Sequence, residues 1–204
     1  YTDDELVDLL VDCKLQTPRY VRLNRIIRDI PAGHVVAGST ASNLREVVQR
    51  RLKDQGRACP CIRCREVRGE KVTGDLRLEA ETYATTGGQE HFLSFNTPSG
   101  KLAGFLRLSL PTPEAAADTG LAELAGAAII REVHVYGPVV RLGDSAEGEA
   151  QHLGLGTALI QEAEQMARAA GFGRLAVISA IGTREYYRKQ GFESGELYMS
   201  KPIG

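Results

Sequence analysis

Four segments of the chain space their apolar residues as amphipathic helices do. The predicted helices cover residues 2–13, 42–54, 155–170 and 183–190. The first begins with Thr2 as N-cap and with acidic residues in its first turn, and Pro18 follows its end. The last two are followed by Gly171 and Gly191, and glycine commonly stops a helix because it adopts the left-handed conformation. The pattern therefore predicts helices near both ends of the chain.

Seven segments are rich in β-forming residues or alternate between apolar and polar positions, as strands do. They are residues 21–27, 76–85, 90–95, 101–108, 127–136, 175–179 and 192–199. Turns at 87–88 and 96–100 join three of them into an antiparallel meander, and residues 111–118 are expected to form a loop. The order of elements predicts an α/β (α+β) fold in two parts. Residues 1–71 form a small helical region with a cysteine knuckle, and residues 72–204 form a mixed, mostly antiparallel sheet flanked by helices.

A glycine-rich loop separates the strand at 127–136 from the helix that begins at Leu155. It reads Q-x-x-G-x-G, with Gln151, Gly154 and Gly156. Glycines at a helix start leave backbone N–H groups uncovered, and the helix macrodipole adds partial positive charge, so such an end binds phosphate. The G-x-G-x-x-G of a dinucleotide fold and the G-K-[ST] of a P-loop are both absent. The loop favours the pyrophosphate of coenzyme A, and a glycine turn without a ligand is the alternative.

Charge is distributed unevenly, although the formal net charge is only −1. Residues 1–13 hold five acidic residues and no basic one, residues 14–71 carry a net charge of +9, and residues 72–204 carry −5. A basic block of this kind indicates a polyanionic partner such as nucleic acid. A solvated face, or a surface that docks a missing part of the protein, is the alternative. The block contains Lys14, Arg19, Arg22, Arg25, Arg28, Arg50, Arg51, Lys53, Arg57, Arg63, Arg65 and Arg68.

Three of the four cysteines form the run C-x-C-x-x-C, at Cys59, Cys61 and Cys64. The chain shows no secretion signal and no apolar run long enough to span a bilayer, so metal binding is favoured over disulfides. Thiolates at this spacing can share one tetrahedral zinc ion. An iron–sulfur cluster and metal-free thiols are the alternatives. The candidates for a fourth ligand are Cys13, His34 and His91.

The order strand, Q-x-x-G-x-G, helix, strand, tyrosine-bearing helix and G-F strand resembles the GNAT acetyltransferase superfamily. Six blocks across nearly the whole chain resemble a narrower family, the catalytic subunits of Elongator. The blocks are RLNRIIRDIP, SNLREVVQRRLKDQG, CIRCREV, REVHVYGPVV, QHLGLGTALIQEAE and GTREYYRKQGF. The complete cysteine run is similar to bacterial and archaeal members. Because the chain begins with Tyr1 rather than Met, it is expected to be the C-terminal fragment of such a protein.

That family joins a radical-SAM domain to a GNAT-type lysine acetyltransferase-like domain and modifies the wobble uridine of tRNA at carbon 5. The resemblance implies acetyl-CoA as acetyl donor, with S-adenosylmethionine and a [4Fe–4S] cluster in the missing radical-SAM domain. It implies that residues 1–71 hold the end of that domain. Its partners would be tRNA and the missing domain, its location cytoplasmic, with no membrane partner. The fragment alone is then not expected to complete the reaction. A histone-type lysine acetyltransferase, or a zinc-stabilised tRNA-binding module with a vestigial coenzyme site, is the alternative.

The loop and the resemblance together indicate the coenzyme-binding residues. Backbone N–H groups of the loop are expected to bind the pyrophosphate, and the preceding strand is expected to pair with the pantetheine amides. These residues are Gln151, Gly154, Leu155, Gly156 and Thr157 in the loop, and Glu132, Val133, His134 and Val135 in the strand. Glu132 and His134 are either general bases or residues that simply alternate between the sheet faces.

Two adjacent tyrosines stand on the last predicted helix. A phenol near the thioester sulfur can protonate the departing thiolate. Neighbouring helical residues point about 100° apart, so only one of the two should face the sulfur. Tyr187 is the expected acid, in contact with the coenzyme, and Tyr186 the expected packing residue. Phosphates of tRNA are expected to contact Lys14, Arg19, Arg22, Arg25 and Arg28.

Overall fold

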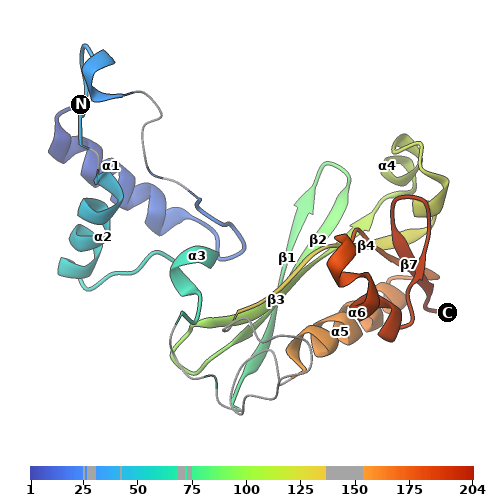
Figure 1. The fold of residues 1–204 in the computed structure, drawn as a ribbon. Coiled ribbons are helices and arrows are strands. Elements are labelled where there is room, and N and C mark those ends of the chain that lie inside the picture. Colours follow the sequence, from blue (N-terminus) through green and yellow to red (C-terminus); the bar gives the residue numbers. More distant parts are fainter. Residues whose placement is uncertain (25, 27–30, 42, 69–71, 73–74, 137–153) are drawn as a thin grey trace. The chain divides into compact units, whose positions relative to one another are not determined.

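The computed structural model describes the chain except for residues 25, 27–30, 42, 69–71, 73–74 and 137–153. The described residues form two compact units, residues 1–66 and 67–204 (Figure 1). The division falls between Glu66 and Val67, five residues before the boundary expected from the sequence. No helix in the described parts of the chain combines the length and the hydropathy that crossing a membrane requires.

Two helices and a short third one make up the first unit. They are α1 (Asp3–Gln16), α2 (Leu44–Asp54) and α3 (Ile62–Arg65), with a 3-10 turn at Ala32–His34. Thr2 and Glu5 form a reciprocal capping box at the start of α1, as the early hydroxyl and acids predict. The core of this unit consists of Val7, Val11, Val48, Leu52, Cys59 and Cys61. Arg51 of α2 forms ion pairs with Asp4 and Asp8 of α1, so the acidic start of the chain neutralises part of the basic block.

The strand predicted at residues 21–27 is wrong over its described part. Residues 21–24 carry no strand, and the peptide groups of Val21 and Asn24 serve other partners. The Val21 carbonyl accepts the N–H of Ile62 at 3.0 Å, and the Asn24 carbonyl accepts the Arg63 guanidinium at 2.6 Å. Leu23 packs on the helical core, while Arg22 pairs with Glu66. An extended segment that lies against helices therefore produces the same alternation as a strand.

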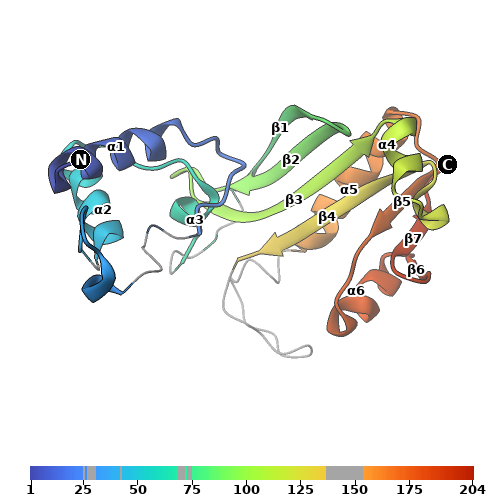
Figure 2. The ribbon, with the colours of Figure 1, turned by 90° about the horizontal axis from the view of Figure 1, so that it is seen from above.

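A seven-stranded sheet forms the second unit (Figures 1 and 2). Its strands are β1 (Arg77–Thr85), β2 (Gly88–Asn96), β3 (Leu102–Pro111), β4 (Ala127–Val135), β5 (Arg174–Val177), β6 (Glu193–Ser194) and β7 (Met199–Pro202). They lie in the order β1-β2-β3-β4-β5-β7-β6, and among these described strands β4 and β5 are the one parallel pair. The prediction of a mixed, mostly antiparallel sheet is confirmed.

Helix α5 (Leu155–Ala169) covers one face of this sheet (Figure 1). Its apolar residues recur at the spacing i, i+4, i+8, so one stripe is buried. Leu159 and Ala163 pack there with Leu106 of β3 and Ile130 of β4, and all four are fully buried. The remaining helical elements are α4 (Pro113–Asp118), α6 (Arg184–Lys189) and 3-10 turns at Ala122–Leu124 and Ile181–Thr183.

Two further expectations about the second unit are corrected. The loop predicted at 111–118 contains helix α4, capped by the Thr112 hydroxyl, which accepts the Ala115 N–H, and begun by a proline in its first turn. That start signal was present in the sequence. The single strand predicted at 192–199 is a hairpin of β6 and β7. The Glu123 carboxylate accepts the N–H groups of Glu196, Leu197 and Tyr198 at 3.0–3.2 Å and so holds the reversing turn.

Candidate active site and metal centre

Strand β4 has an open edge near its end. It pairs with β5 from Ala127 to Ile130, and no described strand pairs with it on that side from there to Val135 (Figure 2). A bulge between Glu132 and Ile130 shifts its register against β3 at the same level. Because bulges bend a strand and increase its twist, β4 turns away from β5 where the pairing stops. The result is a gap beside the last five residues of β4.

The peptide groups along this gap are oriented for a ligand. On the β3 side, the Tyr136 N–H donates to the Ala103 carbonyl at 2.8 Å, and the register places His134 opposite Phe105. Consecutive residues of a strand direct their peptide groups to opposite sides. The N–H and C=O groups of Val133 and Val135 therefore point away from β3, to the side on which β5 has ended. An extended chain with amide groups can pair with such an edge.

Helix α5 begins at the same end of β4 and lacks a side-chain cap. Its N-cap, Gly154, has a φ of 67°, in the left-handed region that favours glycine. Helices α1 and α4 are capped by the hydroxyls of Thr2 and Thr112, whereas no described side chain caps α5. The first-turn N–H groups of α5 thus remain for another acceptor, which a phosphate can supply. Of the predicted loop residues, Gln151 lies outside the described residues.

Helix α6 ends beside the start of α5, where Gln190 donates to the Thr157 hydroxyl at 3.0 Å, and Tyr186 is the tyrosine that reaches Gly156. A Cβ on Gly156 would lie 2.6 Å from Tyr186 Oη, so only glycine admits this ring. Tyr186 Oη is buried without a hydrogen-bond partner among the described residues. Tyr187 is 7% exposed and packs edge-on against Phe192. Burial raises the pKa of both phenols, that of Tyr187 to about 12, so both are protonated donors at neutral pH.

Val133 packs on one face of the sheet, and Glu132 and His134 point to the opposite face. The side chains of β4 therefore alternate between the two faces. His134 Nε2 lies 3.4 Å from Glu132 Oε2, and Arg107 Nε donates to Glu132 Oε1 at 2.9 Å. The hydrogen bond from His134, followed by that from Arg107, lowers the pKa of Glu132 to about 2. A carboxylate this acidic is a weak base, and it instead orients His134. Arg107 could not be singled out from the sequence, since only the β3–β4 register places it opposite Glu132.

The lowered pKa of Glu132 predicts how stability depends on pH. A depressed pKa stabilises the folded state above the unfolded value of about 4.5, and this stability is lost as pH falls towards 2. Glu132→Gln is therefore expected to lower the melting temperature at pH 7 and to leave it nearly unchanged near pH 2. Thermal unfolding of both proteins across pH 2–7 measures the difference. If the difference in melting temperature between the two proteins stays constant from pH 2 to pH 7, altered packing rather than the lost charge explains it.

Three thiols converge in the first unit. The Sγ atoms of Cys59, Cys61 and Cys64 all lie within 4.8 Å of one another, and Cys59 and Cys61 are buried. Zn–S bonds of about 2.3 Å place the sulfurs of a tetrahedral site about 3.8 Å apart, so the three fit one metal ion. Hydrogen bonds among the thiols raise the pKa of Cys59 and lower that of Cys61.

The expected fourth ligand is not found in the described part of the chain. Among the described residues, the cluster of side chains that could hold a metal ion consists of the three cysteines. Cys13 is exposed, and His91 Nδ1 lies 2.8 Å from the Thr82 hydroxyl within the sheet of the other unit. A tetrahedral zinc site needs one ligand besides these three cysteines.

The residues of the basic block differ in their exposure and in their partners. Lys14 is only 1% exposed, so its predicted contact with tRNA phosphate does not agree with its position. Arg22 is exposed but paired with Glu66 at 2.7 Å, and the Arg19 carbonyl accepts a hydrogen bond from Arg65. Arg25 and Arg28 lie outside the described residues. Exposed cations at the end of α2 and just beyond it, Arg50, Lys53 and Arg57, are the best placed for a polyanion.

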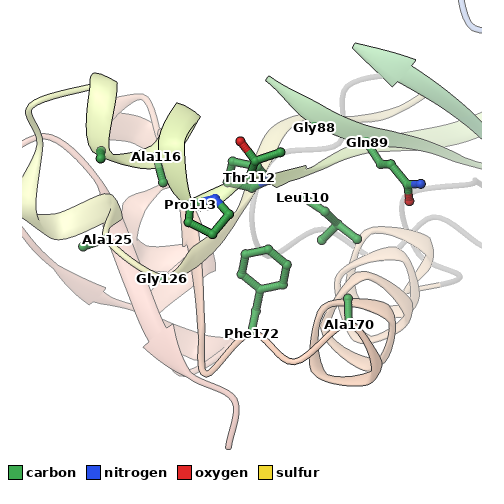
Figure 3. Close-up of a pocket in the computed structure, with 12 residues that line it drawn as sticks. Gly88, Gln89, Leu110, Thr112, Pro113, Ala116, Ala125, Gly126, Ala170 and Phe172 are labelled. Carbon is green, nitrogen blue, oxygen red and sulfur yellow. The ribbon is translucent and has the colours of Figure 1, made fainter. Parts of the chain in front are cut away.

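A cavity of about 590 Å³ lies elsewhere in the second unit (Figure 3). Leu110, Pro113, Ala170 and Phe172 line it, with mostly apolar surface. Ala170 follows the C-terminus of α5, and a 15-residue helix is about 22 Å long, so the cavity lies a helix length from Gly156. It is not the place for a coenzyme bound at the start of α5.

Comparison with known proteins agrees with this geometry. The Acetyltransferase (GNAT) family profile matches residues 68–192, and the Radical_SAM C-terminal domain profile matches residues 1–54. A tRNA uridine(34) acetyltransferase of Dehalococcoides mccartyi is 41% identical over the whole chain, which spans 45% of that protein. Elongator complex protein 3 of Drosophila melanogaster is also 41% identical over the whole chain, which spans 38% of it.

A solved structure extends the similarity to three dimensions. The archaeal Methanocaldococcus infernus Elp3 with an N-terminal deletion superposes with a TM-score of 0.82 at 36% identity. The match covers 99% of this chain and 49% of that one. The chain thus spans less than half the length of the relatives named here. It belongs to the GNAT acetyltransferase family and is, over its whole length, a homologue of Elongator complex protein 3 and the tRNA uridine(34) acetyltransferases.

Proposed function

We propose that residues 67–204 bind acetyl-CoA across the β4 edge and the start of α5. The observation that carries the proposal is the coincidence of two unsatisfied features at one end of β4. The peptide groups of Val133 and Val135 face the gap left by β5, and no described side chain caps α5 at Gly154. Pantetheine has amides for the strand edge, and its pyrophosphate suits the helix start. Membership of the GNAT family supports the same ligand.

We propose further that the acetyl group serves the modification of a tRNA wobble uridine at carbon 5, on the way to a carboxymethyl group. The similarity to a tRNA uridine(34) acetyltransferase supports this substrate. The Radical_SAM C-terminal profile at residues 1–54 supports a longer protein whose remaining part holds S-adenosylmethionine and a [4Fe–4S] cluster. Completion of the reaction then requires that longer protein.

The tyrosines take different roles in this proposal. Tyr186 Oη is buried beside Gly156 and has no hydrogen-bond partner among the described residues, so in this proposal it donates a hydrogen bond to the bound coenzyme. Tyr187, with its pKa raised to about 12, stays protonated at neutral pH and supplies a proton to the departing thiolate. On the other face of β4, Glu132 holds His134 in one orientation.

A charge placed at Gly154 tests the coenzyme site. The position is exposed, a Cβ there meets nothing within 4 Å, and Asp and Asn both tolerate its left-handed backbone. Gly154→Asp adds a carboxylate at the proposed pyrophosphate site, and two such charges about 4 Å apart at a protein surface repel by roughly 1–4 kcal/mol. We expect calorimetry to show acetyl-CoA binding weakened by about 10- to 100-fold.

Two controls make this result specific. Gly154→Asn matches the size without the charge and is expected to bind acetyl-CoA nearly as well as the unmodified chain. Acetyl-pantetheine lacks the pyrophosphate, so its weaker binding should be the same in all three proteins. Equal losses for both ligands, or no loss for either, would place the pyrophosphate elsewhere.

We propose that Arg50, Lys53 and Arg57 bind tRNA through its phosphates. They are exposed and close in sequence on or just after α2. Each neutralised phosphate releases counterions, so affinity should fall steeply with salt. Reversing all three charges to Glu is expected to weaken different tRNAs alike and to flatten the salt dependence by roughly one unit of slope per lost contact. Arg77→Glu, in the sheet unit, is the control. A steep dependence that survives the triple change would assign the contacts to other residues.

We propose that Cys59, Cys61 and Cys64 hold one structural zinc ion. Their mutual distances fit it, and two of them belong to the core of α1 and α2. When bound, the ion would hold residues 59–64 in one conformation, in which Cys59 and Cys61 pack in the core with α1 and α2. The iron–sulfur alternative has less support, because the cluster of the family is implied for the remaining part of the protein.

A further inference from the structure

Lys14 occupies an unusual position for a lysine. It stands in the last turn of α1 and is 1% exposed, which makes it one of the largest fully buried side chains of the described chain. Its polar contact is with a thiol, since Nζ lies 3.9 Å from Cys64 Sγ. No carboxylate forms an ion pair with it among the described residues. Such burial does not agree with the contact to tRNA phosphate that the charge pattern predicts for this residue.

A buried ammonium needs an anion nearby, because desolvation of an unpaired charge is strongly unfavourable. The carbonyl groups at the end of α1 supply only part of that negative charge. Among the described residues, the side chain that contacts Lys14 Nζ is Cys64, whose sulfur belongs to the three-thiol cluster. The buried Nζ of Lys14 therefore lies beside this cluster, at the position that a counter-charge to metal-bound thiolates would take, and this placement is independent of the cysteine spacing.

A second donor reaches the same sulfur. Gln49 of α2 directs Nε2 to Cys64 Sγ at 3.4 Å. A side chain from α1 and one from α2 therefore contact the Cys64 sulfur, while Cys59 and Cys61 pack in the core with these two helices. A divalent ion with three thiolates carries a net charge of −1, and one ammonium neutralises it.

We propose that Lys14 is the built-in counter-charge of the metal–thiolate centre, with Gln49 as an auxiliary N–H···S donor. Lys14 is a positioning residue that acts on the metal through Cys64. It stabilises the negative charge of the loaded site, and it makes docking of α1 dependent on metal. This inference rests on the zinc site proposed above and adds the residue that sets its affinity.

The test compares zinc affinity in Lys14→Met and in the unmodified chain, by competition with a chelator. Loss of a partner that hydrogen-bonds a metal ligand typically weakens metal binding 10- to 100-fold, and we expect a loss in that range. Lys189→Met removes an exposed lysine from α6, in the other unit, and is the matched control, expected to leave the affinity unchanged. Gln49→Leu is expected to cause a smaller loss.

Cobalt loading supplies a readout that a purely structural role would not move. The three thiolates remain in Lys14→Met, so their charge-transfer band should persist, but at longer wavelength, because an uncompensated thiolate gives up electrons more easily. Without metal, Lys14→Met is expected to melt no lower than the unmodified chain, since methionine suits a buried position. If Lys14→Met fails to fold, Lys14→Gln keeps a donor and removes the charge, with the same expected loss.

The outcomes separate the two proposals. An unmodified chain that binds neither zinc nor cobalt overturns the metal site, and with it the role of Lys14. A chain that binds zinc equally well with lysine, methionine or glutamine at position 14 overturns the counter-charge alone.

Discussion

Tyr187→Phe is expected to cut acetyl-CoA turnover about 100- to 10,000-fold, the usual contribution of a general acid, while binding changes little. Phenylalanine keeps the ring that packs against Phe192 at 5.6 Å, so the fold should persist. Burial raises the pKa of Tyr187 to about 12, so the phenol stays protonated below that pH. In the unmodified enzyme, deprotonation of Tyr187 should therefore not lower the turnover rate between pH 7 and 10. Turnover is measured with tRNA in the longer protein, and binding separately.

Tyr186→Phe is the paired control, and the opposite pattern of effects on binding and turnover is expected. Its hydroxyl is buried against Gly156 and has no hydrogen-bond partner in the part of the chain that the structure describes, so its removal is expected to weaken acetyl-CoA binding more than it slows turnover. Full turnover in Tyr187→Phe would make that ring a wall of the site. A large loss of turnover in Tyr186→Phe alone would assign the acid to the other tyrosine.

Cys61→Ser is expected to remove the metal and destabilise the first unit together. Cys61 is fully buried, and its thiol belongs both to the cluster and to the core of α1 and α2. Structural zinc contributes much of the folding free energy of small units, and a loss of only 2 kcal/mol lowers the melting temperature of such a unit by roughly 10 °C. Metal analysis should fall from about one zinc per chain to near zero. Amide exchange in α1 and α2 should quicken.

Cys13→Ser provides the matched control for this change. Cys13 lies on α1, is exposed and does not belong to the cluster, so metal content and amide exchange should stay as they are. An unmodified chain that is purified without metal, and whose α1 and α2 exchange no faster in chelator, would contradict the zinc site.

Much of the second unit could be predicted because its signals are local. The strand at 127–136, the helix from Leu155 and the stop at Gly171 follow from residues within a few positions of one another, and the structure confirms them. The signal failed where partners are distant. Val21 and Asn24 read as a strand, but their carbonyls accept donors from Ile62 and Arg63, some 40 residues later. Alternation of apolar and polar residues shows that one side of a segment is buried, but it does not show whether a strand or a helix covers that side.

Charge patterns were the least reliable guide to surface. Lys14 and Arg65 belong to the same basic block as Arg50 and Lys53, yet the first two are buried and the last two exposed. A count of charges cannot separate them, because burial of a lysine or arginine depends on an anion or carbonyl brought close by the fold. For Lys14 that partner is Cys64, fifty residues along the chain.

The sequence by itself determined the class of fold, the glycine loop at a helix start and the three-cysteine run, since each depends on short-range spacing that the backbone imposes. The tertiary structure alone decided three relations that create chemistry. The β3–β4 register sets Arg107 against Glu132, the end of β5 opens the edge at Val133 and Val135, and the packing of α6 brings Tyr186 Oη to Gly156. Each joins residues far apart in the chain, and their distances are fixed only when the core closes.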